Sequence, residues 1–192
     1  MTHLTTAQEI ARMLAERSER VVFAESCTAG MVAATLGQIA GISKYLCGSV
    51  VSYQPTTKRK WLAVNKKTIN KHTTESQHVA NEMALNVLAF TPNANWSVSV
   101  VGHFGPDAPK EKDGQIFICV ARRTKKKLKV SDTTEYVCKS EGRAKRQEEA
   151  TEAVLTTLAR VLHKRIQKDT RNGETPPKKT AEDKNRKKEV LC

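Results

Sequence analysis

The sequence predicts an α/β fold, a three-layer helix–sheet–helix sandwich with a mixed sheet, from three observations. First, apolar strand-like runs alternate with amphipathic segments over roughly the first hundred residues. Second, the first such run, residues 21–24, is apolar without alternation, as in strands buried on both faces of a sheet. Third, two strand-like runs follow each other within residues 115–139, and a hairpin there adds antiparallel strands to the sheet.

The first half of the chain contains three helix signals and a second strand. Residues 6–17 carry apolar side chains at helical spacing, which predicts the first helix. After the first strand, a second helix is expected over residues 28–39, and Gly41 marks its end. A second strand is expected over residues 47–53. Pro55 suits the first turn of the next helix, because its missing N–H would be unpaired there.

The second half of the chain supplies the remaining strands. Residues 76–90 place their apolar side chains on one face of a helix. A third strand is expected over residues 96–101, followed by a glycine- and proline-punctuated loop over residues 102–114. Residues 115–122 and 127–139 are the two strands of the hairpin, and a basic turn joins them.

The last helix and the domain boundary follow from the distribution of apolar residues. Residues 143–166 repeat apolar side chains at helical spacing, and almost none follow before the final few residues. A segment with so little to bury cannot offset the chain entropy lost on folding. We therefore expect one folded domain over residues 1–167 and a basic, disordered tail over residues 168–192.

Cysteine usage and hydropathy limit the class of protein. The five cysteines are odd in number, widely spaced and without any CxxC pair, which predicts reduced thiols and no zinc site. The first twenty residues lack the apolar stretch of a secretory signal, and no later run reaches transmembrane length. We expect a cytoplasmic protein with no metal, no cofactor and no membrane contact.

The formal charge of +13 leaves two interpretations open. Six of the eight residues from Arg122 to Lys129 are basic, and the tail carries eight basic and five acidic residues. Clustered cations neutralise nucleic-acid phosphates, so this turn and the tail are candidates for weak nucleic-acid contact. The alternative is a solvated hairpin and a solubilising tail.

The junction between the first strand and the next helix carries a candidate nucleophile, Ser26. It lies at the carboxyl end of a sheet strand, where open α/β folds bind ligands. Backbone amides at the start of the following helix are expected to stabilise a phosphate or an oxyanion there. Taken alone, Ser26 fits a helix cap as well as a nucleophile, and the G-x-S-x-G pattern of a nucleophile elbow is absent.

A catalytic serine needs a base, and two residues are candidates. His103 follows the third strand in a glycine-flanked loop and could face the same crevice. Lys58 follows Tyr53 by five residues at a second strand-to-helix junction, and burial would lower its pKa enough for it to act as a base. The alternative is a solvated lysine beside Arg59 and Lys60.

These residues resemble one known family. The run Ala24-Glu25-Ser26-Cys27-Thr28-Ala29-Gly30 closely resembles the A-E-S-C-T-G-G signature of the CinA C-terminal family, which includes bacterial nicotinamide-nucleotide amidohydrolases. The satellite matches, in chain order, are Val50-Val51-Ser52-Tyr53 with Lys58, Trp61-Leu62-Ala63-Val64, residues 72–84, and Gly105-Pro106-Asp107. The resemblance covers residues 6–163, and we expect the module to stand alone.

The resemblance implies an activity and a set of site residues. The family hydrolyses the carboxamide of nicotinamide mononucleotide to nicotinic acid mononucleotide and ammonia. Carried over, Ser26 is the nucleophile, Lys58 the base and Tyr53 a hydroxyl that positions or relays the proton. Residues expected to contact the nucleotide are Glu25, Cys27, Thr28, Ala29, Gly30, Gly102, His103, Gly105 and Arg143. Self-association as a homodimer is also expected.

Several positions depart from the family pattern. Phe104 replaces a small residue before Gly-Pro and could fill space that the substrate needs. Pro55 replaces a common asparagine, Ala108 an expected glycine, Glu141 starts the motif usually written Gly-Asp-Arg, and Gln147 replaces an arginine. A second hypothesis is therefore a catalytically inactive paralogue that binds a nucleotide or a nucleic acid.

Overall fold

The computed structural model describes residues 3–106 and 108–173, and its helices and strands alternate as expected. The elements in order are α1 (His3–Arg17), β1 (Val21–Glu25), α2 (Met31–Gly37), β2 (Leu46–Val51), α3 (Pro55–Leu62), α4 (Lys66–His72), α5 (Gln77–Phe90), β3 (Trp96–Gly102), β4 (Gln115–Arg123), β5 (Leu128–Val137) and α6 (Arg143–Arg171). Two short 3-10 helices, Ile42–Lys44 and Lys110–Lys112, lie in loops.

The five strands form one mixed sheet in the order β2-β1-β3-β4-β5. Strand β1 pairs in parallel with both β2 and β3, while β3–β4 and β4–β5 are antiparallel. The carboxyl ends of β1, β2 and β3 therefore meet at one edge of the sheet. Residues that follow these three strands are brought together there.

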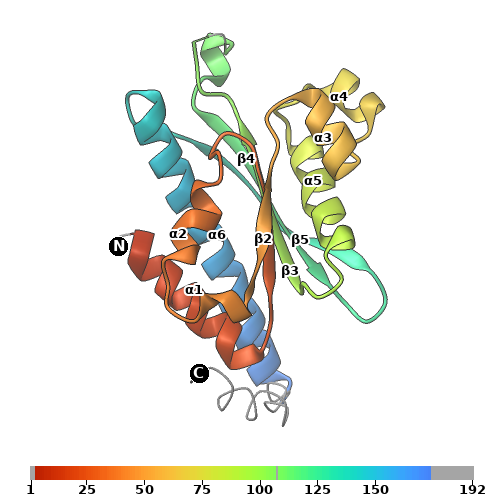
Figure 1. Ribbon diagram of the computed structural model, residues 1–192, viewed down its shortest axis with the longest axis vertical. Coiled ribbons are helices and arrows are strands. Elements are labelled where there is room, and N and C mark those ends of the chain that lie inside the picture. The colour runs from red at the N-terminus through yellow and green to blue at the C-terminus, as the bar shows by residue number, and fades with distance from the viewer. Residues whose placement is uncertain (1–2, 107, 174–192) are drawn as a thin grey trace, which may run out of the picture.

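Helices cover both faces of the sheet, so the predicted three-layer α/β sandwich is confirmed (Figure 1). Alternate residues of β1 point to opposite faces. Val21 and Phe23 pack in the core beneath α1, α2 and α6, and Val22 and Ala24 pack in the core beneath α3 and α5. The unbroken apolar run over the first four residues of β1 is the consequence of this double burial.

Helix α4 was not predicted from the sequence. Its residues, Lys66–His72, are mostly basic, and none of them is fully buried. The signal for its start lies just before it, because the side chain of Asn65 accepts a hydrogen bond from the backbone N–H of Lys67 and caps the first turn. A short helix held mainly by its cap has no apolar periodicity to reveal it.

Helix α6 continues past the expected start of the tail at residue 168. It ends at Arg171. Asp169, near this end, is only 3% exposed, and its carboxylate forms an ion pair of 2.7 Å with Arg17 of α1. Arg165, one turn earlier, approaches the same carboxylate at 2.9 Å. This ion-pair cluster fastens the end of α6 to α1. The rest of the predicted tail, from residue 174, lies outside the described residues.

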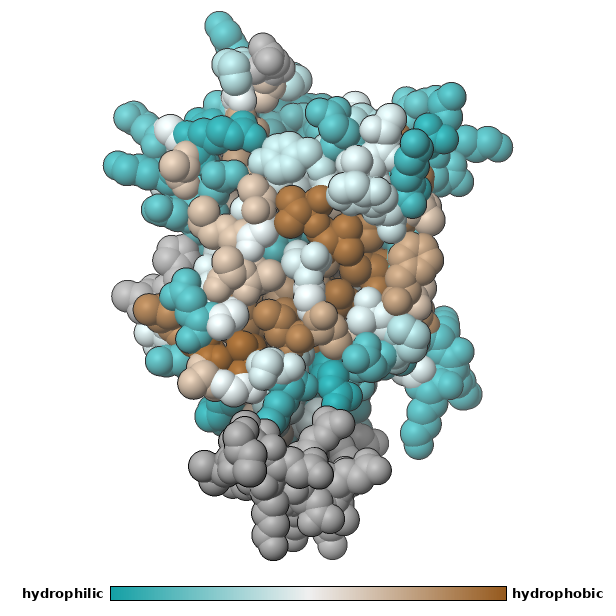
Figure 2. Space-filling view, viewed as in Figure 1, coloured by the Kyte–Doolittle hydropathy of each residue, from teal (hydrophilic) through white to brown (hydrophobic). Residues whose placement is uncertain are grey.

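The sheet is open at β2, which has only β1 as a neighbour. Apolar side chains gather across the middle of this face, where β2 forms the sheet edge (Figure 2). The expected homodimer stays a prediction.

Over the described parts of the chain, no helix has the length and apolar character needed to cross a bilayer.

Replacing Asp169 with asparagine should destabilise the domain. The substitution removes the carboxylate that Arg17 and Arg165 share and leaves Arg17 with Glu19 at 3.3 Å, and breaking a buried pair costs about 3 kcal/mol or more. Denaturant unfolding of D169N should show this loss. The matched control is E16Q, which removes the exposed Glu16–Arg12 pair and should cost less than about 0.5 kcal/mol. Equal losses in both variants would contradict the role assigned to Asp169.

Candidate active site

Ser26 lies at the carboxyl edge of the sheet, held by hydrogen bonds that extend the β ladder by one residue. Its backbone N–H donates to the carbonyl of Val100 at 3.1 Å, and the N–H of Ser52 donates to the carbonyl of Glu25 at 2.8 Å. The chain therefore leaves β1 in a fixed direction. The side chain of Ser26 is 6% exposed, so it lies at the bottom of a crevice rather than on the surface.

Lys58 contacts Ser26 directly. Its Nζ lies 2.8 Å from Ser26 Oγ, 2.8 Å from the carbonyl oxygen of Ser52 and 3.0 Å from that of Tyr53. The side chain has no exposed surface. Pro55 begins α3 directly after the β2 junction, and Lys58 falls one turn later on the face that points back to the sheet. The sequence pair of strand-end tyrosine and lysine thus produces a serine–lysine contact.

Burial changes the acid–base behaviour of Lys58. Removal from water disfavours the ammonium form and lowers the pKa of Lys58 from 10.5 to about 8, against a smaller opposing effect from the carboxylate of Glu75. About a tenth of the lysine is then neutral at pH 7, compared with a negligible fraction for an exposed lysine. Lys58 can accept a proton near neutral pH.

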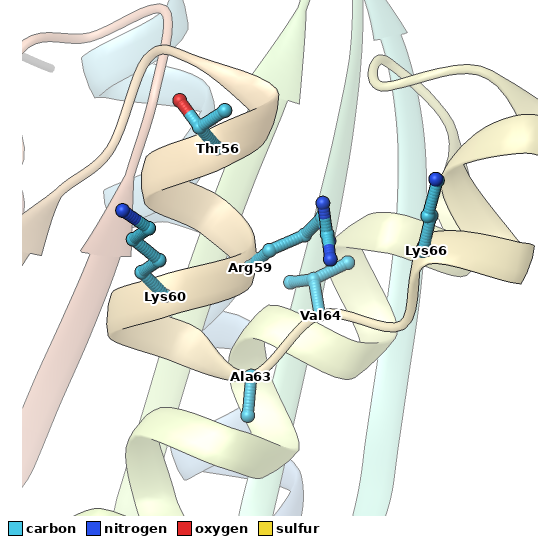
Figure 3. Close-up of a pocket in the computed structure, with 6 residues that line it drawn as sticks. All are labelled: Thr56, Arg59, Lys60, Ala63, Val64 and Lys66. Atoms are coloured by element: carbon cyan, nitrogen blue, oxygen red, sulfur yellow. The ribbon is translucent and has the colours of Figure 1, made fainter.

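The basic neighbours of Lys58 lie on another face of the same helix. Arg59 and Lys60 line a hollow of about 250 Å³ with Thr56, Ala63, Val64 and Lys66 (Figure 3). Because successive helical residues are separated by about 100° around the axis, Lys58 points inward while these cations point outward. Arg59 and Lys60 are therefore solvent-exposed cations, whereas Lys58 is buried, so the alternative of a solvated Lys58 is wrong.

Glu25 organises the turn that carries Ser26. Its carboxylate is 1% exposed and accepts hydrogen bonds at 2.8–3.1 Å from Thr28 Oγ1, Ser49 Oγ and the backbone N–H groups of Gly30, Val32 and Ala33. These amides begin α2, and sequence reasoning expected them to stabilise a ligand's negative charge. The structure corrects that expectation, because the protein's own carboxylate already occupies them. Glu25 faces the turn and not a ligand.

The same tight turn contains three other residues that were expected to contact the nucleotide, namely Thr28, Ala29 and Gly30. Ala29 and Gly30 both have positive φ, of 55° and 94°, and Gly30 precedes the first turn of α2. A Cβ at position 30 would lie 3.4 Å from a methyl group of Val51. The side chain of Thr28 is fully buried and bonded to Glu25. None of these three residues is among those that line the hollow beside Ser26.

That hollow has a volume of about 200 Å³. It is lined by Ser26, Cys27, Tyr53, Glu75, Gly102, His103, Phe104, Gly105, Ala108 and Arg143. The structure therefore brings seven of the sequence-predicted site residues to one cavity. His103 Nε2 has no hydrogen-bond partner in the part of the chain that the structure describes. Gly102 is needed for packing, since a Cβ there would lie 2.5 Å from Ile116 Cγ2.

Phe104 lines the hollow but does not fill it, because its side chain packs in the core. It is 6% exposed and belongs to the core cluster under α1, α2 and α6. Its backbone carbonyl accepts a hydrogen bond of 2.6 Å from Arg143 Nη1. The departure from a small residue at this position therefore anchors the loop and leaves an open cavity beside Ser26.

Three side chains form a hydrogen-bonded group around the backbone carbonyl of Cys27. Tyr53 Oη donates to the carbonyl of Cys27 at 3.5 Å, and Gln147 Nε2 donates to the same oxygen at 2.9 Å. Arg143 Nη2 in turn donates to Tyr53 Oη at 3.3 Å. The Tyr53 hydroxyl is thus within reach of the site mouth and has no direct hydrogen bond to Ser26 or Lys58 among the described residues.

Sequence reasoning did not identify Glu75 and Asp113, and it noted Gln147 only as a replacement for an arginine, without its hydrogen bond to Cys27. Gln147 is one helical turn after Arg143, so its position on the same face was a usable signal. Asp113 accepts hydrogen bonds from the N–H of Gly105 at 2.9 Å and from Arg146 at 2.6 Å, which lowers the pKa of Asp113 and holds the loop. Nothing in the sequence marked Glu75.

Within the described residues, no group of three or more metal-binding side chains is assembled.

Comparison with known proteins identifies the family. A profile of the CinA C-terminal domain matches residues 3–162. The chain belongs to the CinA C-terminal domain family. A CinA-like protein of Thermosipho melanesiensis is 42% identical over 105 residues, which cover 54% of this chain and 26% of the relative. A CinA-like protein of Prochlorococcus marinus strain AS9601 is 33% identical over 119 residues, 61% of this chain and 28% of the relative. The chain thus matches little more than a quarter of these relatives' length.

Solved structures share the fold along most of the chain. The competence damage-inducible protein A of Klebsiella pneumoniae superposes with a TM-score of 0.75 at 25% identity, covering 83% of this chain and 96% of that one. A competence/damage inducible protein of Agrobacterium tumefaciens gives 0.75 at 27% identity, covering 83% and 94%. The CinA family assignment and the α/β fold predicted from the sequence are therefore confirmed.

The lowered pKa of Lys58 predicts a specific pH dependence of stability. The unfolded chain holds the lysine proton up to about pH 10.5, while the folded chain releases it near pH 8, so stability contributed at this residue rises with pH between those values. The unfolding free energy of the wild type, relative to K58M, should increase by about 2 kcal/mol between pH 7.5 and 10.

The comparison with K58M removes the effect of the buried thiols of Cys119 and Cys138, while Cys27, which interacts electrostatically with Lys58, is removed from both proteins by a C27A substitution. Burial raises the pKa of Cys119 and Cys138 to about 12, so their contribution to stability falls above pH 9 in both proteins. Denaturant unfolding at a series of pH values measures the difference. A gap between wild type and K58M that does not change with pH would show that Lys58 titrates normally.

Proposed function

We propose that the protein is a serine amidohydrolase that converts the carboxamide of nicotinamide mononucleotide, or a related nucleotide amide, to the acid and ammonia. The observation that carries the proposal is the 2.8 Å contact between the buried Lys58 Nζ and Ser26 Oγ. A serine hydroxyl is a weak nucleophile unless an adjacent base removes its proton. The resemblance of residues 24–30 to the amidohydrolase signature supplies the substrate class.

The hydrogen bonds around Lys58 suit a neutral amine acting as a base. A neutral amine has two N–H bonds and one lone pair. The carbonyl oxygens of Ser52 and Tyr53 can accept the two N–H bonds, which leaves the lone pair for the hydroxyl proton of Ser26. The backbone at the end of β2 thus selects the rotation of the amine that activates the serine.

The reaction proceeds in two balanced steps. Ser26 Oγ attacks the amide carbon while its proton passes to Lys58. The tetrahedral intermediate then collapses, the C–N bond breaks, and Lys58 returns the proton to the leaving nitrogen as ammonia departs. Water, deprotonated by the same amine, attacks the acyl-enzyme ester and releases the carboxylic acid and the free serine. No redox change is involved.

Two features of the site suit the developing charges. Cys27 follows Ser26 and lines the hollow, so its backbone N–H is the candidate donor to the oxyanion. The exposed guanidinium of Arg143, at the mouth of the hollow, offers charge for a phosphate. A volume of about 200 Å³ is below the ~300–1,000 Å³ usual for a whole ligand, so the hollow fits the amide-bearing ring.

We place this reaction in the cytoplasm. Cys27, Cys47, Cys119 and Cys138 are all free thiols, which persist in a reducing compartment.

A second candidate function is nucleotide binding without turnover. The observation that favours it is that the Tyr53 hydroxyl, expected to position or relay the proton, has no hydrogen bond to Ser26 or Lys58 among the described residues and contacts Cys27 and Arg143 instead.

Ammonia release from nicotinamide mononucleotide tests the proposal. Purified wild-type protein should release ammonia, and S26A should reduce kcat/KM by at least about a thousandfold, because the nucleophile is lost. The matched control is S52A. The Ser52 hydroxyl is buried beside the site and has no partner among the described residues, and only the backbone carbonyl of this residue contacts Lys58. S52A should stay within about threefold of wild type.

Two outcomes would overturn the amidohydrolase proposal for this substrate. One is ammonia release by S26A equal to that of the wild type, which would point to a contaminant or to another nucleophile. The other is saturable binding of nicotinamide mononucleotide by the wild type with no ammonia at any pH from 7 to 9. That result would establish the second candidate, a nucleotide-binding protein without turnover.

A further inference from the structure

A second polar hollow, of about 250 Å³, lies at the opposite end of the sheet from Ser26. It is bounded by the β4–β5 hairpin and the last turns of α6, and its lining is Trp96, Arg122, Lys129, Val130, Ser131, Asp132, Val161, Lys164, Arg165 and Lys168. Trp96 starts β3, whereas the Ser26 site lies beyond the end of that strand. The hollow, here called the basic groove, is therefore separate from the candidate active site.

The basic groove brings like charges together from two elements. In the β4–β5 ladder, Arg122 lies directly opposite Lys129, an arrangement that destabilises a sheet. On α6, Lys164 and Lys168 are separated by four residues, so they share a helix face and repel each other. Cations near the end of a helix suit its dipole, but that effect does not reach Arg122 and Lys129 on the sheet.

The carboxylates near the basic groove are engaged elsewhere. Asp132 pairs with Arg160 at 2.6 Å, and Asp169 accepts from Arg17 and Arg165. Glu19 accepts from the indole N–H of Trp96 at 2.6 Å. The charged side-chain groups of four cations, Arg122, Lys129, Lys164 and Lys168, have no hydrogen bond or ion pair with the residues that the structure describes.

The crowding is strong enough to alter acid–base behaviour. The guanidinium of Arg122, with smaller contributions from desolvation and from Lys168, Lys127 and Arg165, lowers the pKa of Lys129. Desolvation, followed by repulsion from Arg165, lowers the pKa of Arg122, against an opposing effect of the Asp169 and Glu19 carboxylates. An anion bound between these residues would offset the repulsion among the cations.

We propose that the basic groove binds a phosphorylated small molecule that carries at least two phosphoryl groups. Each phosphoryl group carries about −1.5 to −2 charge, so two of them match the four unpaired cations. The cations line opposite walls of a concave site, and Arg122 is partly buried at one wall. All four line the same hollow of about 250 Å³, so a compact anion bound there lies among cations from both walls. A nucleic-acid backbone would instead favour protruding cations such as Lys125 and Lys126 at the hairpin turn.

Tryptophan fluorescence provides a direct readout. The chain has two tryptophans, of which Trp96 lines the groove and Trp61 is 57% exposed on α3. The W61F protein therefore reports on the groove alone. Titration with sodium tripolyphosphate at about 150 mM salt should give a saturable change in emission. K129E in the W61F background should raise the Kd at least tenfold, and K168E, on the other wall, should do the same.

The control variant is K126E, which makes the same charge change at the hairpin turn and outside the groove lining. It should change the Kd for tripolyphosphate by less than about twofold. Three results would overturn the proposal: no saturable change in the W61F protein, equal weakening by K126E and K129E, or binding of a 20-base-pair DNA duplex under conditions where tripolyphosphate does not bind. Thermal unfolding checks that K129E and K168E are folded, and neither readout depends on amide hydrolysis.

Discussion

The buried contact between Lys58 and Ser26 is the constraint on which the rest of the candidate site depends. An ammonium group without exposed surface is unfavourable, and the fold retains it by giving its nitrogen three oxygen partners. Two of these are backbone carbonyls that the end of β2 supplies. The same burial that reduces stability at neutral pH lowers the pKa of Lys58 to about 8, so that part of the amine is neutral near pH 7 and can accept the serine proton.

A second buried ionisable group, Glu25, fixes the other side of Ser26. Its five donors come from the turn, from α2 and from β2, so the position of Ser26 is determined by elements on three sides. The carboxylate takes the place of a ligand anion at the start of α2. In the proposed function, recognition of the substrate is therefore assigned to the loop after β3 and to Arg143, which line the hollow beside Ser26.

Much of the fold was predictable because burial leaves a periodic pattern. Strand β1 and helix α5 were predicted from apolar spacing, whereas α4 rests on the Asn65 cap and α6 was predicted to end too early because Asp169 is polar but buried. The site residues were predicted by position at strand ends and by family resemblance. The role of Glu25 was not, because the sequence shows that it adjoins Ser26 but not which way its carboxylate points.

Labelling of Ser26 by a small sulfonyl fluoride tests the central claim most directly, because it requires no knowledge of the substrate. Mass spectrometry of the modified protein and its peptides measures the rate at each pH. The account predicts that Ser26 is the modified residue, that the rate rises through about pH 8, and that K58M abolishes labelling. Labelling of Ser26 at equal rates in wild type and K58M would contradict it.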